Sequence, residues 1–391
     1  MTEWIECTLD KLGEIVGGAT PSTKCEDYYG GSIPWITPKD LSSFKGRYIT
    51  SGERNITEKG LASCSAQMMP KDAVLFTSRA PIGYVAIASQ SVCTNQGFKS
   101  IVVNEKADPL FVYYLLKYNK DAIEAMGSGT TFKEVSGKTM RAVKVRIPLD
   151  VSYQKRIAAV LDSLDTKIEN NERINDNLYA QAKAIFDNHF INIDAIPAGW
   201  RKGNLLDIAN YLNGLAMQKF RPQGNEIGLP VLKIKELRQG SCDDSSELCS
   251  LSIKPEYIIH DGDVVFSWSG SLLVDIWCGG TCGLNQHLFK VTSDVYDKWF
   301  YYLWTAHHLA RFIAIAADKA TTMGHIKREE LAKAEVLIPC EEDYTSFNSI
   351  MQPIFELMIS NRIESRKLAA LRDELLPKLM SGEIDVSDVQ I

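Results

Sequence analysis

The 391-residue chain has room for two or three domains of ordinary size, and its composition, 45% hydrophobic and 24% charged, is that of a water-soluble globular protein. The net charge of −6 argues against a protein that coats nucleic acid by charge alone. It still allows a DNA reader with a local basic surface.

Neither export nor a membrane span is expected. The first residues lack the basic region and apolar core of a signal peptide, and no stretch approaches the ~20 apolar residues that cross a bilayer. The nine cysteines contain no CxxC pair, and the segment CGGTC, residues 278–282, is a weak metal candidate. We therefore expect reduced thiols, a cytoplasmic protein and no bound metal.

The first globule is predicted over residues 1–149, with a strand at 74–76 and a helix at 110–118. Near its end, Gly137-Lys138-Thr139 resembles the end of a phosphate-binding loop. The glycine that such a loop needs five residues earlier is replaced by Phe132, and a β-branched run follows at 143–147. Nucleotide binding is therefore not expected here.

The same region is unusually basic for an acidic chain. Residues 130–156 contain seven Lys or Arg against Glu134 and Asp150. Charge alone is equally consistent with a DNA contact surface and with an ordinary solvated strand and helix start.

Long helices are predicted over residues 150–192 and 341–391, with Asp150 or Ser152 as a cap of the first. Their mostly apolar side chains alternate in steps of four and three, which is a heptad seam. The seam consists of Ile157, Leu161, Leu164, Ile168, Asn171, Asn175, Leu178, Ala182 and Ile185 in the first helix, and of Phe347, Met351, Ile354, Met358, Asn361, Ser365, Leu368, Arg372 and Leu375 in the second. An antiparallel pair within the chain, its register fixed by the asparagines, is favoured over a parallel dimer.

Between the helices, after a short linker at 192–200, a second globule is predicted over residues 193–340, with a strand at 264–266 and a helix at 301–312. It repeats the first globule in collinear order. The matches are Trp4 with Trp200, Leu9 with Leu205, Gly18 with Gly214 and 33–41 with 229–237 at an offset of 196; 72–78 with 263–269, Thr130-Thr131 with Thr321-Thr322 and Pro148 with Pro339 at 191; and Asn95-Gln96 with Asn285-Gln286 at 190.

Two unequal globules, each followed by a long helix, resemble the specificity subunit of a type I restriction-modification enzyme. The strands DAVLFTSR and GDVVFSWS, the helix QKRIAAVLDSLDTKI and the closing LLPKLMSGEI support the resemblance, which covers essentially the whole chain. It implies an α+β fold of two duplicated α/β target recognition domains, joined by two long antiparallel coiled-coil helices with pseudo-two-fold symmetry. The second helix departs from the family pattern at its start, where CEEDYTSF replaces a Pro-rich entry.

The resemblance also implies a function. Each globule would read one half of a bipartite site in double-stranded DNA, and the helices would set the spacing and dock two methylating subunits, which motor–nuclease subunits join. No adenine-methylation motif, S-adenosylmethionine loop or Walker A motif is present, so a non-catalytic subunit without cofactors is expected. A coiled-coil adaptor that does not read DNA is the alternative.

The expected DNA contacts lie at strand ends and loops. Arg79, beside Ser78, could reach a guanine edge, and lysines could contact phosphate, although surface ion pairs or solvated lysines are equally consistent. The candidates are Ser78, Arg79, Lys99, Thr130, Thr131, Lys133 and Lys138 in the first half, and Trp268, Ser269, Lys319, Thr321, Thr322, His325 and Lys327 in the second. Because Asn95-Gln96 and Asn285-Gln286 recur in both copies, we expect them to make structural hydrogen bonds. Leu375, Leu376 and Leu379 are expected to contact the methylating subunit.

Overall fold

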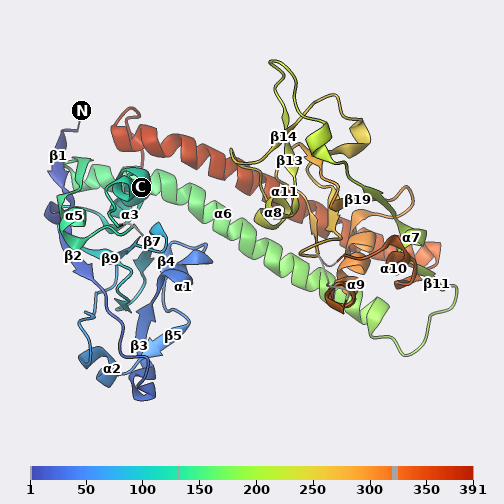
Figure 1. Ribbon diagram of the computed structural model, residues 1–391, viewed down its shortest axis with the longest axis horizontal. Coiled ribbons are helices and arrows are strands. Elements are labelled where there is room, and N and C mark those ends of the chain that lie inside the picture. Colours follow the sequence, from blue (N-terminus) through green and yellow to red (C-terminus); the bar gives the residue numbers. More distant parts are fainter. Residues whose placement is uncertain (1, 130–132, 319–324, 391) are drawn as a thin grey trace. The chain divides into compact units, whose positions relative to one another are not determined.

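The computed structural model describes residues 2–129, 133–318 and 325–390. The chain divides into unit 1, which comprises Met1–Glu169 and Leu368–Ile391, and unit 2, Asn170–Lys367. Each unit contains one globule and one segment of each of the two long helices, α6 (Val151–Phe186) and α11 (Glu341–Ser381) (Figure 1).

The globule of unit 1 is built on two sheets and a two-stranded ribbon. A five-stranded sheet has the order β2-β9-β6-β7-β4, a three-stranded sheet has the order β5-β3-β8, and β1 pairs with β10. The strands are β1 (Trp4–Thr8), β2 (Gly13–Gly17), β3 (Tyr29–Ile36), β4 (Tyr48–Ile49), β5 (Arg54–Ile56), β6 (Val74–Ser78), β7 (Ile82–Ala88), β8 (Cys93–Thr94), β9 (Lys99–Val103) and β10 (Lys144–Pro148). The short helices are α1 (Pro38–Ser42), α2 (Glu58–Ala62), α3 (Pro109–Tyr118), α4 (Lys120–Ala125) and α5 (Gly137–Ala142).

The globule of unit 2 repeats this plan. Its sheets have the orders β12-β19-β16-β17 and β14-β13-β18-β15, and its ribbon pairs β11 with β20. The strands are β11 (Arg201–Asn204), β12 (Asn210–Asn213), β13 (Leu229–Leu232), β14 (Leu248–Cys249), β15 (Ile258–Ile259), β16 (Val264–Ser267), β17 (Leu273–Ile276), β18 (Cys282–Leu284), β19 (Leu288–Thr292) and β20 (Glu335–Ile338). The helices are α7 (Leu205–Ile208), α8 (Ile234–Gln239), α9 (Lys298–Asp318) and α10 (Arg328–Ala332).

The internal repeat is confirmed by matching backbone contacts. Gly18 and Gly214 each lie so close to the strand opposite that an added Cβ would be 2.1 Å from the Asn95 carbonyl oxygen and 2.2 Å from the Asn285 carbonyl oxygen. A side chain at either position would push the backbones apart, which explains why glycine stands at both. The helix α5, which begins at Gly137, corresponds to α10, so the GKT segment opens a short helix and does not follow a strand directly.

One part of the predicted alignment is wrong by a single residue. The N–H of Asp72 donates to the Ala88 carbonyl at 2.8 Å, and that of Gly262 donates to the Trp277 carbonyl at 2.7 Å. Asp72 and Gly262 also share a left-handed backbone, with φ of 68° and 86°. Strand β6 therefore matches β16 at an offset of 190 instead of 191, so Ser78 corresponds to Trp268.

Each globule has its own hydrophobic core, to which the long helices contribute. In unit 1, Ile157 and Leu161 of α6 and Leu379 of α11 are buried against α3 and the sheet. In unit 2, Phe186 at the end of α6 packs with Trp304 of α9, and Phe190, in the π-helical segment Asp187–Ile191 that follows α6, packs with Trp299 of α9. The N–H of Ser152 donates to Asp150 Oδ1 at 2.9 Å, so Asp150 caps the start of α6, one of the two caps predicted.

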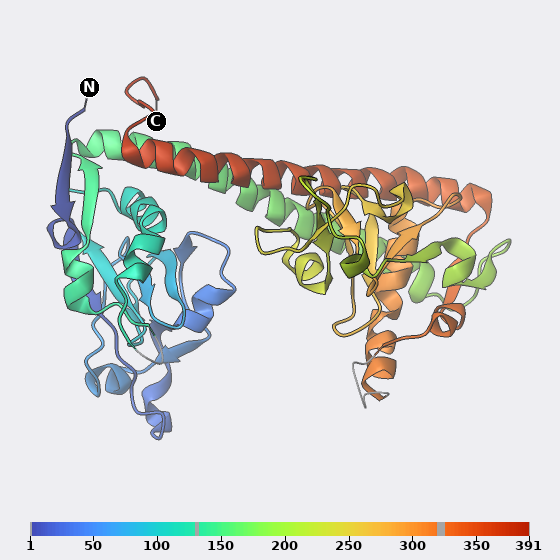
Figure 2. The same cartoon turned by 45° about the horizontal axis from the view of Figure 1, so that its top comes forward.

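The helix segments pair antiparallel within each unit, as predicted. In unit 1, Asp165 of α6 accepts a bond from Arg372 of α11 at 2.7 Å, while Tyr153 near the start of α6 donates to Asp385 beyond the end of α11. In unit 2, Asn171 contacts Asn361 and Asn175 donates to the Met358 carbonyl at 3.0 Å. Both views show the two segments side by side within each unit (Figures 1 and 2).

Candidate nucleic-acid interface

In unit 1, charged side chains meet where β6 ends and β9 begins, because these two strands are neighbours in the sheet. Glu134 lies between two cations, with its Oε2 3.4 Å from Arg79 Nη1 and its Oε1 3.6 Å from Lys99 Nζ. Arg79 is 35% exposed and Glu134 38% exposed. Lys99 is less exposed, at 17%, and its Nζ also donates to the Phe98 carbonyl at 3.2 Å, so Arg79 is the more accessible of the two cations. We call Arg79, Lys99 and Glu134 the charged cluster.

Further basic residues gather beside the charged cluster. A Cβ added at Gly137 would lie 3.7 Å from the guanidinium nitrogens of Arg141 and 3.8 Å from Cδ of Lys99. Lys133 and Lys138 are exposed on the same segment. The basic stretch that the sequence singled out therefore adjoins Arg79 and Lys99, which lie far from it in sequence.

The expectation for Ser78 is corrected by its burial. Its side chain has no exposed surface, and its hydroxyl donates to the Gly97 carbonyl at 3.2 Å. Its own carbonyl accepts the N–H of Val135 at 3.0 Å. Ser78 therefore holds the segment that carries Glu134 and does not face solvent itself.

In unit 2, the end of β16 carries aromatic and imidazole groups in place of charges. The Trp268 ring lies 6.1 Å from the His287 ring and 6.2 Å from the His325 ring, and its Nε1 donates to Asn213 Oδ1 at 3.0 Å. Ser269 is only 4% exposed, and its hydroxyl is 2.9 Å from His287 Nδ1. Ser269 is thus committed to positioning His287, which corrects its expected contact with DNA. We call Trp268, His287 and His325 the aromatic cluster.

The two clusters occupy the same place in the repeated fold. The carbonyl of Ser78 accepts the N–H of Val135, and the carbonyl of Trp268 accepts the N–H of Ile326, both at 3.0 Å. Arg79 thereby corresponds to Ser269, and Glu134 to His325. The backbone is retained at this place in the fold, while the side-chain chemistry differs.

Comparison with known proteins decides the family. Residues 1–180 match the model of the type I restriction modification DNA specificity domain. Over 414 aligned residues, covering 99% of this chain and 95% of the relative, the sequence is 34% identical to the specificity subunit of the type I restriction enzyme MjaIX from Methanocaldococcus jannaschii. The chain belongs to the type I restriction enzyme specificity subunits.

A solved structure agrees on the fold of this specificity subunit. The crystal structure of the type I restriction-modification S subunit from M. genitalium matches it with a TM-score of 0.60 at 15% identity, over 97% of this chain and 96% of that chain. The predicted duplication of α/β globules with long coiled-coil helices is thereby confirmed.

Several predicted site residues of the specificity subunit remain predictions. Lys327 is exposed and precedes α10. The other positions, Thr130, Thr131, Lys319, Thr321 and Thr322, lie outside the described residues. Two residues of the clusters, Glu134 and His287, were missed by the sequence reasoning, since their importance depends on contacts across the sheet.

The paired asparagines have the structural role that their recurrence predicted. Asn95 Oδ1 accepts the N–H of Gly97 at 2.8 Å, and Asn285 Oδ1 accepts the N–H of His287 at 3.2 Å. Each side chain closes the same turn before β9 or β19. In the specificity subunit these amides support the loops beside the clusters.

Of the three expected partner contacts near the C-terminus, only that of Leu379 is contradicted by burial. Leu379 is 1% exposed in the core of unit 1, and Leu375 and Leu376 are partly buried against that core. The end of α11 packs onto the globule of unit 1, so Leu379 stabilises that core, whereas the contacts expected of Leu375 and Leu376 stay predictions. Leu371, one turn earlier, is 44% exposed and is the better candidate for a contact with another protein.

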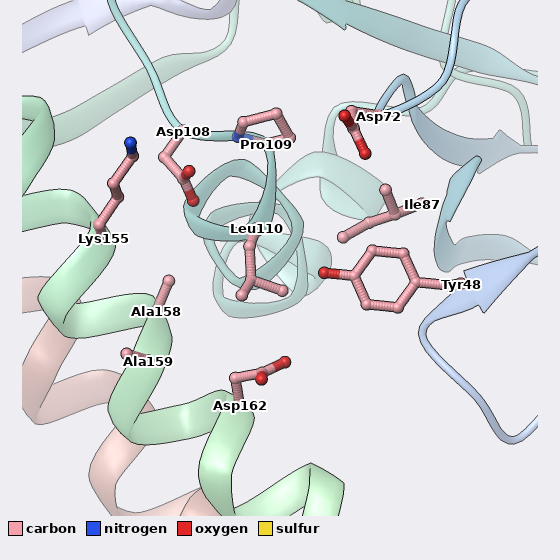
Figure 3. Close-up of a pocket in the computed structure, with 10 residues that line it drawn as sticks. All are labelled: Tyr48, Asp72, Ile87, Asp108, Pro109, Leu110, Lys155, Ala158, Ala159 and Asp162. Atoms are coloured by element: carbon pink, nitrogen blue, oxygen red, sulfur yellow. The ribbon is translucent and has the colours of Figure 1, made fainter. Parts of the chain in front are cut away.

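A cavity of about 410 Å³ in unit 1 does not suit DNA. Its lining includes Asp72, Asp108 and Asp162, and Figure 3 shows these carboxylates and the Tyr48 hydroxyl turned toward the same space. Three carboxylates against Lys155 would repel phosphate. Among the described residues, no group of three or more His, Cys, Asp or Glu could hold a metal ion, and no helix is long and apolar enough to cross a membrane.

Proposed function

We propose that this specificity subunit reads a bipartite site in double-stranded DNA, with target recognition domains at residues 1–149 and 193–340. The long helices, residues 150–192 and 341–391, set the spacing between the half-sites. The observation that carries the proposal is the equivalence of the charged and aromatic clusters, which place different chemistry at one position of a repeated fold.

The charged cluster suits contact with a guanine or with phosphates. Arg79 projects from a strand end and can donate two parallel bonds to a guanine edge. Lys99, Lys133 and Lys138 supply positive charge for phosphates on either side. Glu134 bridges Arg79 and Lys99 and offsets the repulsion between them, and DNA would replace it as their partner.

The aromatic cluster suits base edges read without strong charge. His325 offers ring nitrogens to a base, and Trp268 offers an apolar face to a thymine methyl group. Lys327 follows two residues later and can reach a phosphate. Thr130, Thr131, Lys319, Thr321 and Thr322 enter this proposal on their sequence positions alone.

The subunit itself carries out no catalysis in this proposal and binds no cofactor. Two methylating subunits supply the reaction and further phosphate contacts, and motor–nuclease subunits join them, as the family relationship suggests. This division of labour accounts for an acidic chain with only local basic surfaces. Its place of action would be the cytoplasm, where the DNA is.

The experiment determines which DNA sequence motif is methylated by the complex of this subunit with its methylating subunit. Arg79→Ala is expected to weaken the base preference at one position of one half-site. His325→Ala is expected to weaken the base preference in the other half-site only. Arg54→Ala, an exposed arginine on β5, serves as the matched control and leaves both halves unchanged. A single variant that altered both halves together, or a complex that methylates without sequence preference, would overturn the proposal.

A further inference from the structure

We propose that Arg47 in unit 1 and the pair Arg362 and Arg366 in unit 2 are positioning residues that hold each globule at one fixed angle on the long helix that follows it. We call these contacts the first clamp and the second clamp. The inference rests on the proposed function, because a fixed angle makes the spacer between two half-sites strict.

The first clamp joins the globule of unit 1 to α6. Arg47 Nε lies 3.0 Å from Asp162 Oδ1, Nη1 lies 3.4 Å from Glu169 Oε1, and Nη2 donates to Thr166 Oγ1 at 2.8 Å. The three partners are spaced by four and three residues, so they lie on one face of the helix. Arg47 is only 6% exposed, whereas its partners Asp162 and Glu169 are 31% and 37% exposed, so the guanidinium is buried and the carboxylates reach the surface.

The backbone of Arg47, the arginine of the first clamp, is fixed by the sheet. Its carbonyl accepts the N–H of Ile87 in β7 at 2.7 Å, which ties it to the central sheet. The guanidinium makes one hydrogen bond to α6, to Thr166, and two ion pairs, to Asp162 and Glu169, that lack hydrogen-bond geometry. A turn of the sheet against α6 would break this hydrogen bond and separate both ion pairs together.

The second clamp joins the globule of unit 2 to α11 with the charges reversed. Arg362 binds Asp275 through two bonds of 2.9 and 2.7 Å, and Arg366 binds Asp261 through two bonds of 2.7 and 2.8 Å. Arg366 also donates to the Cys278 carbonyl at 2.6 Å. Here the helix supplies the arginines, and the globule supplies the carboxylates from β17 and from the turn before β16.

Both clamps lie away from the clusters proposed to meet DNA, and neither contributes a side chain to them. A solely stabilising role would need no such geometry, since replacing ion pairs of this kind by apolar residues often costs nothing. Several contacts between each globule and its helix, one arginine with three partners in unit 1 and two bidentate pairs in unit 2, instead restrict orientation. Orientation is what a reader of two separated half-sites must control.

The experiment measures methylation by the full complex on a set of DNA sites that share both half-sites and differ only in spacer length. Arg47→Met and Arg362→Met are each expected to raise methylation at spacers one base pair too long or too short by about tenfold relative to the correct spacer, a change equivalent to ~1.4 kcal/mol of lost discrimination. Both half-sites should stay unchanged. Arg362→Lys keeps the charge without the fork and should give an intermediate effect.

A double variant that restores the ion pair distinguishes an effect on the orientation of the globule from an effect on its folding. Arg362→Asp combined with Asp275→Arg should recover the strict spacer that Arg362→Asp alone loses. Equal loss of methylation at every spacer, or an unchanged ratio between spacers in a folded Arg47→Met or Arg362→Met variant, would overturn the inference. A wild-type complex that methylates no bipartite motif would instead contradict the proposed function.

Discussion

Asn171 and Asn361 meet in the helix pair of unit 2, where Asn171 Nδ2 is 3.5 Å from the Asn361 carbonyl oxygen. The Asn361 side chain in turn donates to Asn175 Oδ1 at 2.9 Å. Both side chains are buried, at 1% and 8% exposure. These buried amides favour one register over its neighbours, since a shift would break the bonds that their nitrogens donate across the seam.

Replacement of one amide should therefore cost stability. Asn171→Ala removes the bonds to Glu364, Ser365 and Asn361, and we expect the free energy of unfolding to fall by about 1–3 kcal/mol in urea titrations. Asn177→Ala, an exposed asparagine on the same helix, is the control and should change it by less than ~0.5 kcal/mol. Equal effects of the two variants would show that the amide pair contributes nothing specific.

The C-terminal leucines should divide into structural and surface residues. Leu379→Ala creates a cavity in the core of unit 1 and should lower the free energy of unfolding by about 2–5 kcal/mol. Leu371→Ala, on an exposed face of the same helix, should leave unfolding unchanged and weaken co-purification with the methylating subunit. Normal co-purification of a folded Leu371→Ala chain would argue against this surface.

Lys133 and Lys138 should contribute to DNA binding without contributing to sequence choice. Their joint replacement by alanine is expected to reduce the slope of log affinity against log salt by about two, since each phosphate contact contributes ~0.9. Lys144→Ala is the control, because Lys144 lies on the β1–β10 ribbon and belongs to neither proposed cluster. The measurement is a binding titration of the complex at several salt concentrations, and an unchanged slope would remove these lysines from the interface.

The stability of unit 2 should decrease in mild acid. Burial lowers the pKa of His308 below its ordinary value, and its Nε2 donates to the Glu335 carbonyl at 2.8 Å. The unfolded chain then binds a proton more readily than the folded one, so stability is lost as pH falls through the ordinary histidine pKa of ~6.5. Thermal unfolding between pH 7.5 and 5.5 should show this loss, and His308→Gln should reduce it; an equally steep loss in the variant would exclude His308 as its source.

If the length of the two helices sets the spacer of the DNA site, both helices must be lengthened together to change that spacer. Because Asn171 and Asn175 bond to α11, an insertion into α6 alone would break the register. Seven residues that continue the heptad, inserted after Glu169 and after Lys367 together, add ~10 Å, comparable to ~3 base pairs. Either the spacer of the methylated motif grows or methylation is lost, whereas full methylation at the original spacer would contradict this role of the helices.

The sequence predicted the elements whose patterns are long or repeated. The heptad seam predicted both long helices and a register fixed by Asn171 and Asn361, since a period sustained over many turns is compatible with few other structures. The repeat located Gly18 with Gly214 and gave Asn95 and Asn285 their structural role. The alignment of β6 with β16 failed by one residue because short apolar strands match almost equally well at adjacent offsets; only the shared left-handed backbone of Asp72 and Gly262 resolves it.

The candidate interface was predicted less completely. Arg79 and Lys99 were identified as strand-end cations, but the burial of Ser78 and Ser269 depends on the loops that cover them. Glu134 and His287 have no distinctive sequence context, and their roles follow only from the side chains that the sheet brings beside them. Pairwise contacts across a sheet are not encoded in local spacing.

The opposite polarity of the two clamps restricts how such chains can be recombined. A hybrid with two copies of the first globule would leave Arg362 and Arg366 without the carboxylates of Asp261 and Asp275. A hybrid with two copies of the second would leave Asp162 and Glu169 without Arg47. Within this chain each globule therefore matches only the long helix that follows it, so the two globules cannot be interchanged without unpairing both clamps.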